Sequence, residues 1–266
     1  MILPIRYEDR EVATFVSDDE ASGWRYSDTW LSESDRFPAS LTIPLGEAPI
    51  APEVVIPWLM NLLPEGEPLR AMARVLGASA DDVIGLIMET GGDLAGALTI
   101  GEHSIVGEPG YRAIADTEML ERIIEGLPAR PFLMGEEGVT MSLAGAQDKL
   151  PVALRGEELT IPVNGAPSTH ILKPDNPHLI GSVQNEALCM VLAHRIGLAT
   201  APVTTGIAGE RSYLLVERYD RISEGGRLHR LHQEDFCQAL GRPPAAKYQY
   251  NRSGRRGPSL PDMFHL

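Results

Sequence analysis

Between residues 141 and 220 the hydrophobic pattern switches between strand-like and helix-like stretches in an order that few folds can accommodate. A turn of small residues, SLAGAQDK at 142–149, leads into an apolar strand, and two more strands follow, the second ending at Lys173. The stretch SVQNEALCMVLAHRIGL has apolar residues at helical spacing, with Ser182 as its expected N-cap and Gly197 at its end. A hairpin comes next. This order predicts a sheet accompanied by one helix.

The first hundred residues have a different pattern, in which short strands precede a group of helices. The opening strands are broken by acidic turns, and Val12, Phe15 and Trp24 are their expected core side chains. SLTIPL, at 40–45, has the composition of another strand. Three stretches of helical periodicity follow, and Ser79 is the expected N-cap of the third. This part of the chain therefore predicts a small α+β domain.

The change of pattern also places the expected domain boundaries. A connector rich in Gly and Glu at 101–111 separates the two parts. At a typical domain size of roughly 150 residues, 266 residues correspond to about two domains. We expect an N-terminal subdomain at 1–105, a sheet-and-helix unit at 106–222 and the start of a further unit at 223–266. The predicted fold class is α+β.

Charge and composition exclude several function classes. The 37 acidic residues outnumber the 23 basic ones, and the net charge of −14 works against direct binding of nucleic acid, which needs clustered Lys and Arg. No apolar run of about 18 residues occurs, so no membrane span is expected. The two cysteines, Cys189 and Cys237, match no metal spacing and are typical of reduced, buried thiols. We expect a soluble protein of the cytoplasm.

Two features of the sheet-and-helix unit could bind phosphate. The turn at 142–149 has one glycine between two alanines, so its backbone can approach an anion closely, although a simple hairpin tip is the alternative interpretation. Lys173 ends a strand and Glu186 lies on the next helix. Protein kinases use such a pair, a strand lysine facing a helix glutamate, to hold the α and β phosphates of ATP. Taken singly, Lys173 could be a solvated strand end and Glu186 a first-turn carboxylate favoured by the helix dipole.

The sequence LLVERYDR at 214–221 passes from an apolar strand into alternating charges. Such a junction suits a hinge whose backbone hydrogen-bonds a planar base. A solvated strand exit is the alternative, and the spacing alone does not choose between the two.

Seven segments in a fixed order resemble the HipA family of bacterial serine/threonine kinases, the toxins of type II toxin-antitoxin pairs. They are NLLPEG, GGDLAGAL, SLAGAQDK, PSTHILKPD, NEALCMVLAHRIGL, LLVERYDR and LHQEDFCQALG. The resemblance covers almost the whole chain. It implies a small N-terminal α+β domain followed by a protein-kinase-like ATP-binding lobe, built from an antiparallel sheet and a helix, and then a C-lobe that is truncated here.

The resemblance also implies roles for single residues. Ser142 matches the serine that these kinases autophosphorylate, an event that displaces the loop from the ATP site. Glu186 is assigned by analogy as the partner of the phosphate-binding lysine. The nucleotide-binding residues so implied are Ala144, Gly145, Ala146, Gln147, Asp148, Lys149, Lys173, Glu217, Arg218 and Tyr219.

The cofactors that the family implies are ATP and Mg²⁺. Its substrate is typically glutamyl-tRNA synthetase, and its partner is a small DNA-binding antitoxin of the HipB type, so any contact with DNA would be indirect. A kinase C-lobe supplies a catalytic Asp, a nearby Asn and a metal-binding Asp. Here only Asp235 and Asp262 follow the hinge region, and neither has that context. We therefore assign no catalytic and no metal-binding residue.

Two functions remain open at this point. In the first, the chain is part of a kinase toxin that binds ATP, with catalysis lost or supplied by another chain. In the second, it is an inactive binding module that sequesters an antitoxin or a partner kinase. The first expectation carries a physical corollary, because Phe236 and Leu240 on the helix at 232–240 would face water unless another surface covers them.

Overall fold

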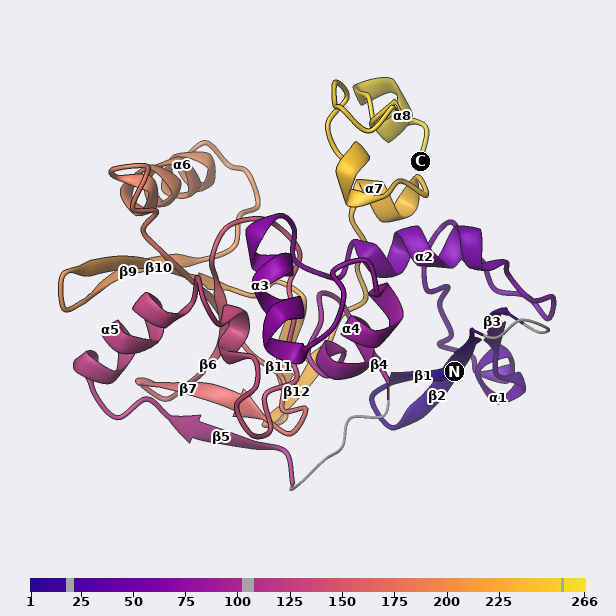
Figure 1. Ribbon diagram of the computed structural model, residues 1–266, viewed down its shortest axis with the longest axis horizontal. Helices are drawn as coiled ribbons and strands as arrows, with labels where there is room; N and C mark the ends of the chain where they lie inside the picture. The colour runs from indigo at the N-terminus through magenta and orange to yellow at the C-terminus, as the bar shows by residue number, and fades with distance from the viewer. Residues whose placement is uncertain (18–21, 102–107, 255) are drawn as a thin grey trace.

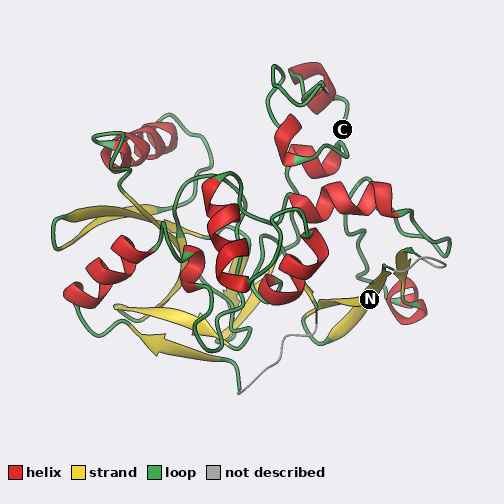
Figure 2. Cartoon of the chain, viewed as in Figure 1, coloured by secondary structure: helices red, strands yellow, loops and turns green. Residues whose placement is uncertain are grey.

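The N-terminal part of the chain forms a four-stranded antiparallel sheet with helices packed against it, as the ribbon diagrams show (Figures 1 and 2). The computed structural model describes residues 1–17, 22–101, 108–254 and 256–266. The strand order is β3-β2-β1-β4, and β1 pairs with both β2 and β4. The strands are β1 (Ile2–Tyr7), β2 (Arg10–Val16), β3 (Gly23–Tyr26) and β4 (Leu98–Ile100).

Aromatic side chains join this sheet to its helices. Trp24 and Trp58 meet edge to face, with ring centroids 5.8 Å apart, and Val12, Phe15 and Trp24 are buried as predicted. Helix α3 ends at Gly77, whose φ of 65° is the left-handed conformation that favours glycine. The helices are α1 (Asp28–Ser32), α2 (Pro52–Met60), α3 (Glu67–Leu76) and α4 (Val83–Thr90).

Two local predictions for this part are wrong. Residues 40–45 form no strand and have only an isolated bridge between Ser40 and Ile43, because Glu234 binds both the Ser40 hydroxyl and the Leu41 N–H. Helix α4 is capped by Asp82, which accepts a hydrogen bond from the Gly85 N–H at 2.9 Å, and not by Ser79.

The second sheet is antiparallel throughout and is accompanied by one long helix, which confirms the predicted fold class. Its strand order is β5-β7-β6-β8-β10-β9. The strands are β5 (Gly110–Ala113), β6 (Leu150–Arg155), β7 (Glu158–Val163), β8 (His170–Pro174), β9 (Val203–Ala208) and β10 (Arg211–Glu217). The associated helices are α5 (Thr117–Gly126), the 3₁₀ turn η1 (Pro131–Leu133) and α6 (Ser182–Arg195).

Helix α6 lies against β9 and β10 and leaves most of its surface open (Figure 1). Its N-cap is Gly181, with φ of 77°, whereas the Ser182 hydroxyl accepts a hydrogen bond from the Asn176 N–H. Ser182 is therefore not the cap that the sequence predicts. The apolar residues that share a helix face are mostly exposed, namely Leu188 (66%), Val191 (48%), Leu192 (57%) and Ile196 (69%).

The last part of the chain is a hairpin followed by short helices, which lie beside α2 at the top of Figure 1. The helix predicted at 232–240 is shorter in the structure, because α7 begins only after its N-cap, Asp235. Phe236 is half exposed, as expected, whereas Leu240 is partly buried. The elements are β11 (Arg221–Glu224), β12 (Arg227–Arg230), α7 (Phe236–Ala239), η2 (Pro244–Ala246) and α8 (Leu260–Phe264).

The two expected domain boundaries fall at different kinds of site. The boundary at 105/106 lies outside the described residues, whereas the boundary at 222/223 falls inside β11, so the hairpin straddles it.

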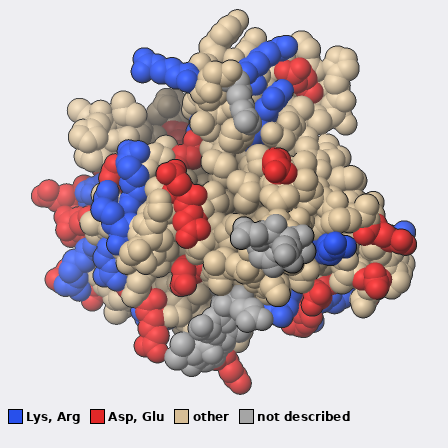
Figure 3. Space-filling view, turned by 45° about the vertical axis from the view of Figure 1, so that its right-hand side comes forward, with Lys and Arg blue, Asp and Glu red and all other residues tan. Residues whose placement is uncertain are grey.

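In the described part of the chain, no helix has the length and apolar character needed to cross a membrane. On the face drawn in Figure 3, acidic side chains lie among the basic ones. Cys189 is exposed and Cys237 is buried, so only the second fits the expectation of a buried thiol.

Candidate nucleotide site

The small-residue turn predicted from SLAGAQDK is a loop whose backbone is folded around a lysine. Lys149, at the start of β6, donates hydrogen bonds from Nζ to the carbonyl oxygens of Ala144 (2.8 Å) and Gly145 (3.2 Å). Gly145 has φ of 103°, and a Cβ there would meet Lys149 Nζ at 3.1 Å, so the bend requires glycine. The loop therefore encloses a cation whose direct hydrogen-bond partners, among the described residues, are two carbonyl oxygens.

Burial changes the acidity of this lysine. Only 8% of Lys149 is exposed, and burial together with the charge of Lys173 lowers its pKa to about 8, although Glu65 and Asp148 act in the opposite direction. An anion near Lys149 would oppose both causes, because it would compensate the buried charge and screen the repulsion from Lys173. The site is thus prepared for a negatively charged group.

The structure brings Lys173 and Glu186 together. Lys173 lies on β8 opposite Leu214 of β10, and Glu186 is one turn into α6. Lys173 Nζ donates to Glu186 Oε1 at 2.6 Å. The Lys173 side chain is 22% exposed and the Glu186 side chain is 33% exposed. The ion pair fixes the direction of the lysine side chain and leaves its remaining N–H donors available.

The loop, the ion pair and the hinge all line one cleft of about 570 Å³. Leu143, Ala144 and Lys149 come from the loop side, and Lys173 and Glu186 come from the sheet and the helix. The hinge side is formed by residues 216–220, and apolar side chains such as Ile171 and Met190 complete the lining. A cleft lined by two ammonium groups and several apolar side chains has the chemistry to accept a phosphorylated ligand that carries an apolar or planar group.

The four central loop residues stay outside this cleft lining. Gly145, Ala146, Gln147 and Asp148 are not among its lining residues, and Gln147 lines a neighbouring surface hollow that Glu186 shares. Burial raises the pKa of the Asp148 carboxyl, against the charge of Lys149. Only Ala144 and Lys149 of the predicted loop residues therefore reach the cleft in this conformation.

The hinge residues have separate orientations. Glu217 is the last residue of β10 and pairs with His170, and Tyr219 is largely exposed with its hydroxyl hydrogen-bonded to Gln233. The Arg218 side chain is only 2% exposed and points into the protein. Its N–H donates to the Thr169 carbonyl oxygen at 2.9 Å, and its carbonyl oxygen accepts from the Arg221 N–H at 3.3 Å, so its main chain is also held within the protein. The sequence did not predict this inward orientation.

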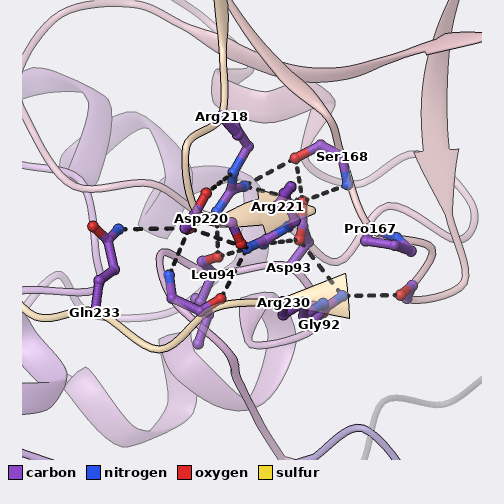
Figure 4. Close-up of polar contacts among 12 residues, drawn as sticks. Gly92, Asp93, Leu94, Pro167, Ser168, Arg218, Asp220, Arg221, Arg230 and Gln233 are labelled. Atoms are coloured by element: carbon purple, nitrogen blue, oxygen red, sulfur yellow. Dashed lines mark hydrogen bonds and ion pairs between the residues drawn. The ribbon is translucent and has the colours of Figure 1, made fainter. Parts of the chain in front are cut away.

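Beneath the cleft, five charged side chains and a serine form a buried network (Figure 4). Arg221 Nη2 lies 2.8 Å from Asp93 Oδ1, Arg218 Nη2 lies 2.7 Å from Asp220 Oδ2, and the Ser168 hydroxyl donates to Asp93 at 2.5 Å. The members are Asp93, Ser168, Arg218, Asp220, Arg221 and Arg230.

This network sets the position of the hinge. Burial raises the pKa of Asp93, but the charges of its three arginine partners outweigh that effect and hold the pKa below its ordinary value. The Gly96 N–H donates to Asp220 at 2.8 Å, so the N-terminal region holds the hinge directly. Sequence reasoning missed Asp93, although an aspartate inside the small apolar segment GGDLAGAL is a signal of a partnered buried charge.

Ser142 is fully buried behind the loop. Its hydroxyl donates to the Leu62 carbonyl oxygen and its N–H donates to the Asp93 carbonyl oxygen, each at 3.2 Å. In this conformation the hydroxyl faces the N-terminal region and does not line the cleft. Any modification of Ser142 requires the segment to move first.

The residues that the structure describes do not form a magnesium site. Among them, no three His, Cys, Asp or Glu side chains are grouped so that they could hold a metal ion. Asp235 and Asp262 belong to capping boxes at the starts of α7 and α8. Both aspartates therefore take part in capping short helices in this structure.

Comparison with known proteins identifies the domains. Residues 3–101 match the HipA N-terminal domain, and residues 141–266 match the HipA-like C-terminal domain. The chain is 40% identical to a putative kinase, Y4mE, of Sinorhizobium fredii over 100% of this chain and 64% of the relative. It is 34% identical to the serine/threonine-protein kinase toxin HipA of Shewanella oneidensis over 91% of this chain and 57% of the relative.

A solved structure agrees with the sequence comparison. The chain matches Shewanella oneidensis HipA, determined in complex with HipB and its operator DNA, with a TM-score of 0.82 and 32% identity over 99% of this chain. The chain spans 57 to 64% of the length of these relatives. The two matched domains, their order and the shared fold lead to one conclusion: this chain belongs to the HipA-like kinase toxin family.

Proposed function

We propose that the chain binds ATP in the cleft between the 142–149 loop and the hinge, as the nucleotide-binding part of a HipA-like serine/threonine kinase. The observation that carries this proposal is the convergence of Lys149 and Lys173 on a single cleft that the hinge residues also line. Two cations together with apolar and hinge residues in one cleft suit a molecule with a polyphosphate and a planar base.

Each part of the cleft has a distinct task in this proposal. Lys173, oriented by Glu186, contacts the phosphates, and Lys149 supplies a second positive charge beside them. The hinge residues Glu217, Arg218 and Tyr219 lie against the base, and the buried network fixes the position of Arg218. Bound ATP would supply the transferable phosphoryl group. We assign no magnesium ligand among the described residues, which contain no group of three His, Cys, Asp or Glu side chains placed to hold a metal ion.

The wider function follows the family. We propose that an intact form phosphorylates a translation factor such as glutamyl-tRNA synthetase in the cytoplasm, that it pairs with a HipB-type antitoxin, and that phosphorylation of Ser142 displaces the loop. The support is the family membership and the relative that is solved with HipB and operator DNA. Contact with DNA would then pass through the antitoxin, in keeping with the net charge of −14.

Calorimetric titration with MgATP tests the nucleotide proposal. Wild type should bind, and Lys173→Ala should bind at least about tenfold more weakly, because a charge-assisted phosphate contact is lost. Arg122→Ala is the matched control, since Arg122 is an exposed cation on α5 that pairs only with Glu118 in the described structure. Equal, weak binding by wild type and Lys173→Ala would contradict the proposal.

The alternative function, a binding module that sequesters an antitoxin or a partner kinase, has an observation in its favour. The open face of α6 exposes four large apolar side chains, and Phe236 is 50% exposed. Equal, weak ATP binding by wild type and Lys173→Ala would favour this module.

A further inference from the structure

The NLLPEG turn at 61–66, between α2 and α3, touches the nucleotide loop from outside the cleft. The Glu65 N–H donates to the Gly145 carbonyl oxygen at 3.2 Å, and Pro64 and Gly145 are paired in a parallel bridge. The Leu62 carbonyl oxygen accepts the hydrogen bond from the Ser142 hydroxyl. A main-chain hydrogen bond at Gly145 and a side-chain hydrogen bond at Ser142 therefore join the turn to both ends of the SLAG segment.

The Glu65 side chain is held by a residue far along the sequence. Lys247 Nζ lies 2.9 Å from Glu65 Oε1 and 2.7 Å from Oε2. The Lys247 side chain is 30% exposed and the Glu65 side chain is 22% exposed. Lys247 follows η2, in the segment after α7. One residue thus contacts the loop through its N–H and the C-terminal segment through its carboxylate.

The Gly145 carbonyl oxygen is the point where these contacts meet. It accepts the Glu65 N–H from one side and Lys149 Nζ from the cleft side. A carbonyl oxygen has two lone pairs, so both are used. If the 61–66 turn moves away, the loop loses an anchor at the residue whose positive φ defines its bend.

We infer that Glu65 is a positioning residue for the nucleotide loop, and that its ion pair with Lys247 couples the loop to the segment after α7. This inference rests on the proposed ATP site for its binding consequence, but the coupling itself concerns only the loop. The ion pair restrains the turn, the turn restrains Gly145, and Gly145 sets where Ala144 and Lys149 lie in the cleft.

The test compares Lys247→Met and Lys247→Arg by hydrogen exchange of the amides at 143–148 and by MgATP titration. Lys247→Met should raise exchange of these amides at least about threefold and weaken ATP binding by a similar factor. Lys247→Arg, which can keep the pair, should restore both quantities to within about twofold of wild type. Glu67→Gln is the matched control, because Glu67 lies two residues on and pairs with Arg70 and Arg74 only within α3.

A charge exchange makes the test independent of folding defects. The double variant Glu65→Lys with Lys247→Glu should bring loop exchange closer to wild type than either single variant does. Unchanged loop exchange in Lys247→Met, or an equal effect in Glu67→Gln, would overturn the inference. Absence of ATP binding by wild type would overturn the proposed function, yet faster loop exchange in Lys247→Met would still support the coupling.

Discussion

Lys149 is a buried cation whose direct hydrogen-bond partners are carbonyl oxygens of its own loop. Such partners stabilise an ammonium group less than a carboxylate does, and for this reason burial and Lys173 can lower its pKa to about 8. The small-residue turn and the family resemblance together placed Lys149 in an anion-binding loop. Its burial could not be predicted, because the loop that encloses it folds against Glu65, which lies eighty residues before Gly145 in the chain.

This lowered pKa predicts that ATP binding weakens at alkaline pH. Above a pKa of about 8 the unliganded lysine loses its proton, so binding of a phosphate must take a proton up, and affinity falls as pH rises. Calorimetric titrations from about pH 6.5 to 9.5 should show this decline in wild type and a smaller one in Lys149→Met. An equally steep decline in both proteins would contradict the role given to Lys149.

The buried charge of Asp93 contributes to the free energy of unfolding of the chain. It is buried with three arginine partners, so Asp93→Asn leaves excess positive charge in the interior. The free energy of unfolding should fall by about 3–5 kcal/mol, measured by urea denaturation. The exposed Asp9→Asn is the control and should change stability little.

The same residue predicts an acid limit to stability. Because the folded protein holds the pKa of Asp93 below its unfolded value, its stabilisation is complete above about pH 4 and is lost as pH falls further. Denaturation midpoints of wild type and Asp93→Asn should therefore differ by a constant amount above about pH 4 and converge progressively as the pH falls below that value. A constant difference at all acidic pH values would contradict the assignment.

At the scale of single elements, periodicity predicted most strands and helices, whereas caps and isolated strands were less predictable. The strand expected at 40–45 is absent because Glu234, some 190 residues later, binds its polar groups. The caps of α4 and α6 are shifted by one to three residues, because a neighbouring residue has the required geometry. Local pattern fixes the type of an element, but distant partners fix its ends.

Helix α6 offers a direct comparison between its two faces. Leu192 is 57% exposed, whereas Val183 is buried at 2%. Leu192→Glu should change the free energy of unfolding by less than about 0.5 kcal/mol, and Val183→Glu should lower it by more than about 2 kcal/mol. Urea denaturation distinguishes them, and a large loss of stability in Leu192→Glu would show that the face is covered.

The segment that carries Ser142 predicts how a negative charge would act on the nucleotide loop. The Ser142 side chain is fully buried beside the carbonyl oxygens of Leu62 and Asp93, so Ser142→Asp places a carboxylate among acceptors. Repulsion should displace the loop and weaken ATP binding about tenfold or more. Ser142→Ala should retain binding within about threefold, and equal binding by wild type and Ser142→Asp would contradict the mechanism.

At the scale of the whole molecule, the N-terminal region helps to build the cleft. Asp93 and Gly96 hydrogen-bond to Arg221 and Asp220, which follow the hinge. The Glu65 N–H donates to the loop at Gly145, and the Asn61 side chain donates to the Arg242 carbonyl oxygen in the segment after α7. The sequence predicted two successive units but not these contacts, because their partners are 80 to 181 residues apart. The resemblance located the cleft's parts, and only the fold reveals that a buried ionic network supports them.

The most direct measurement is a crystal structure of this chain with a non-hydrolysable ATP analogue. We predict phosphate oxygens within hydrogen-bond distance of Lys173 and the base against residues 217–219. An analogue bound elsewhere, or bound in the cleft with its phosphates turned away from Lys173, would contradict it.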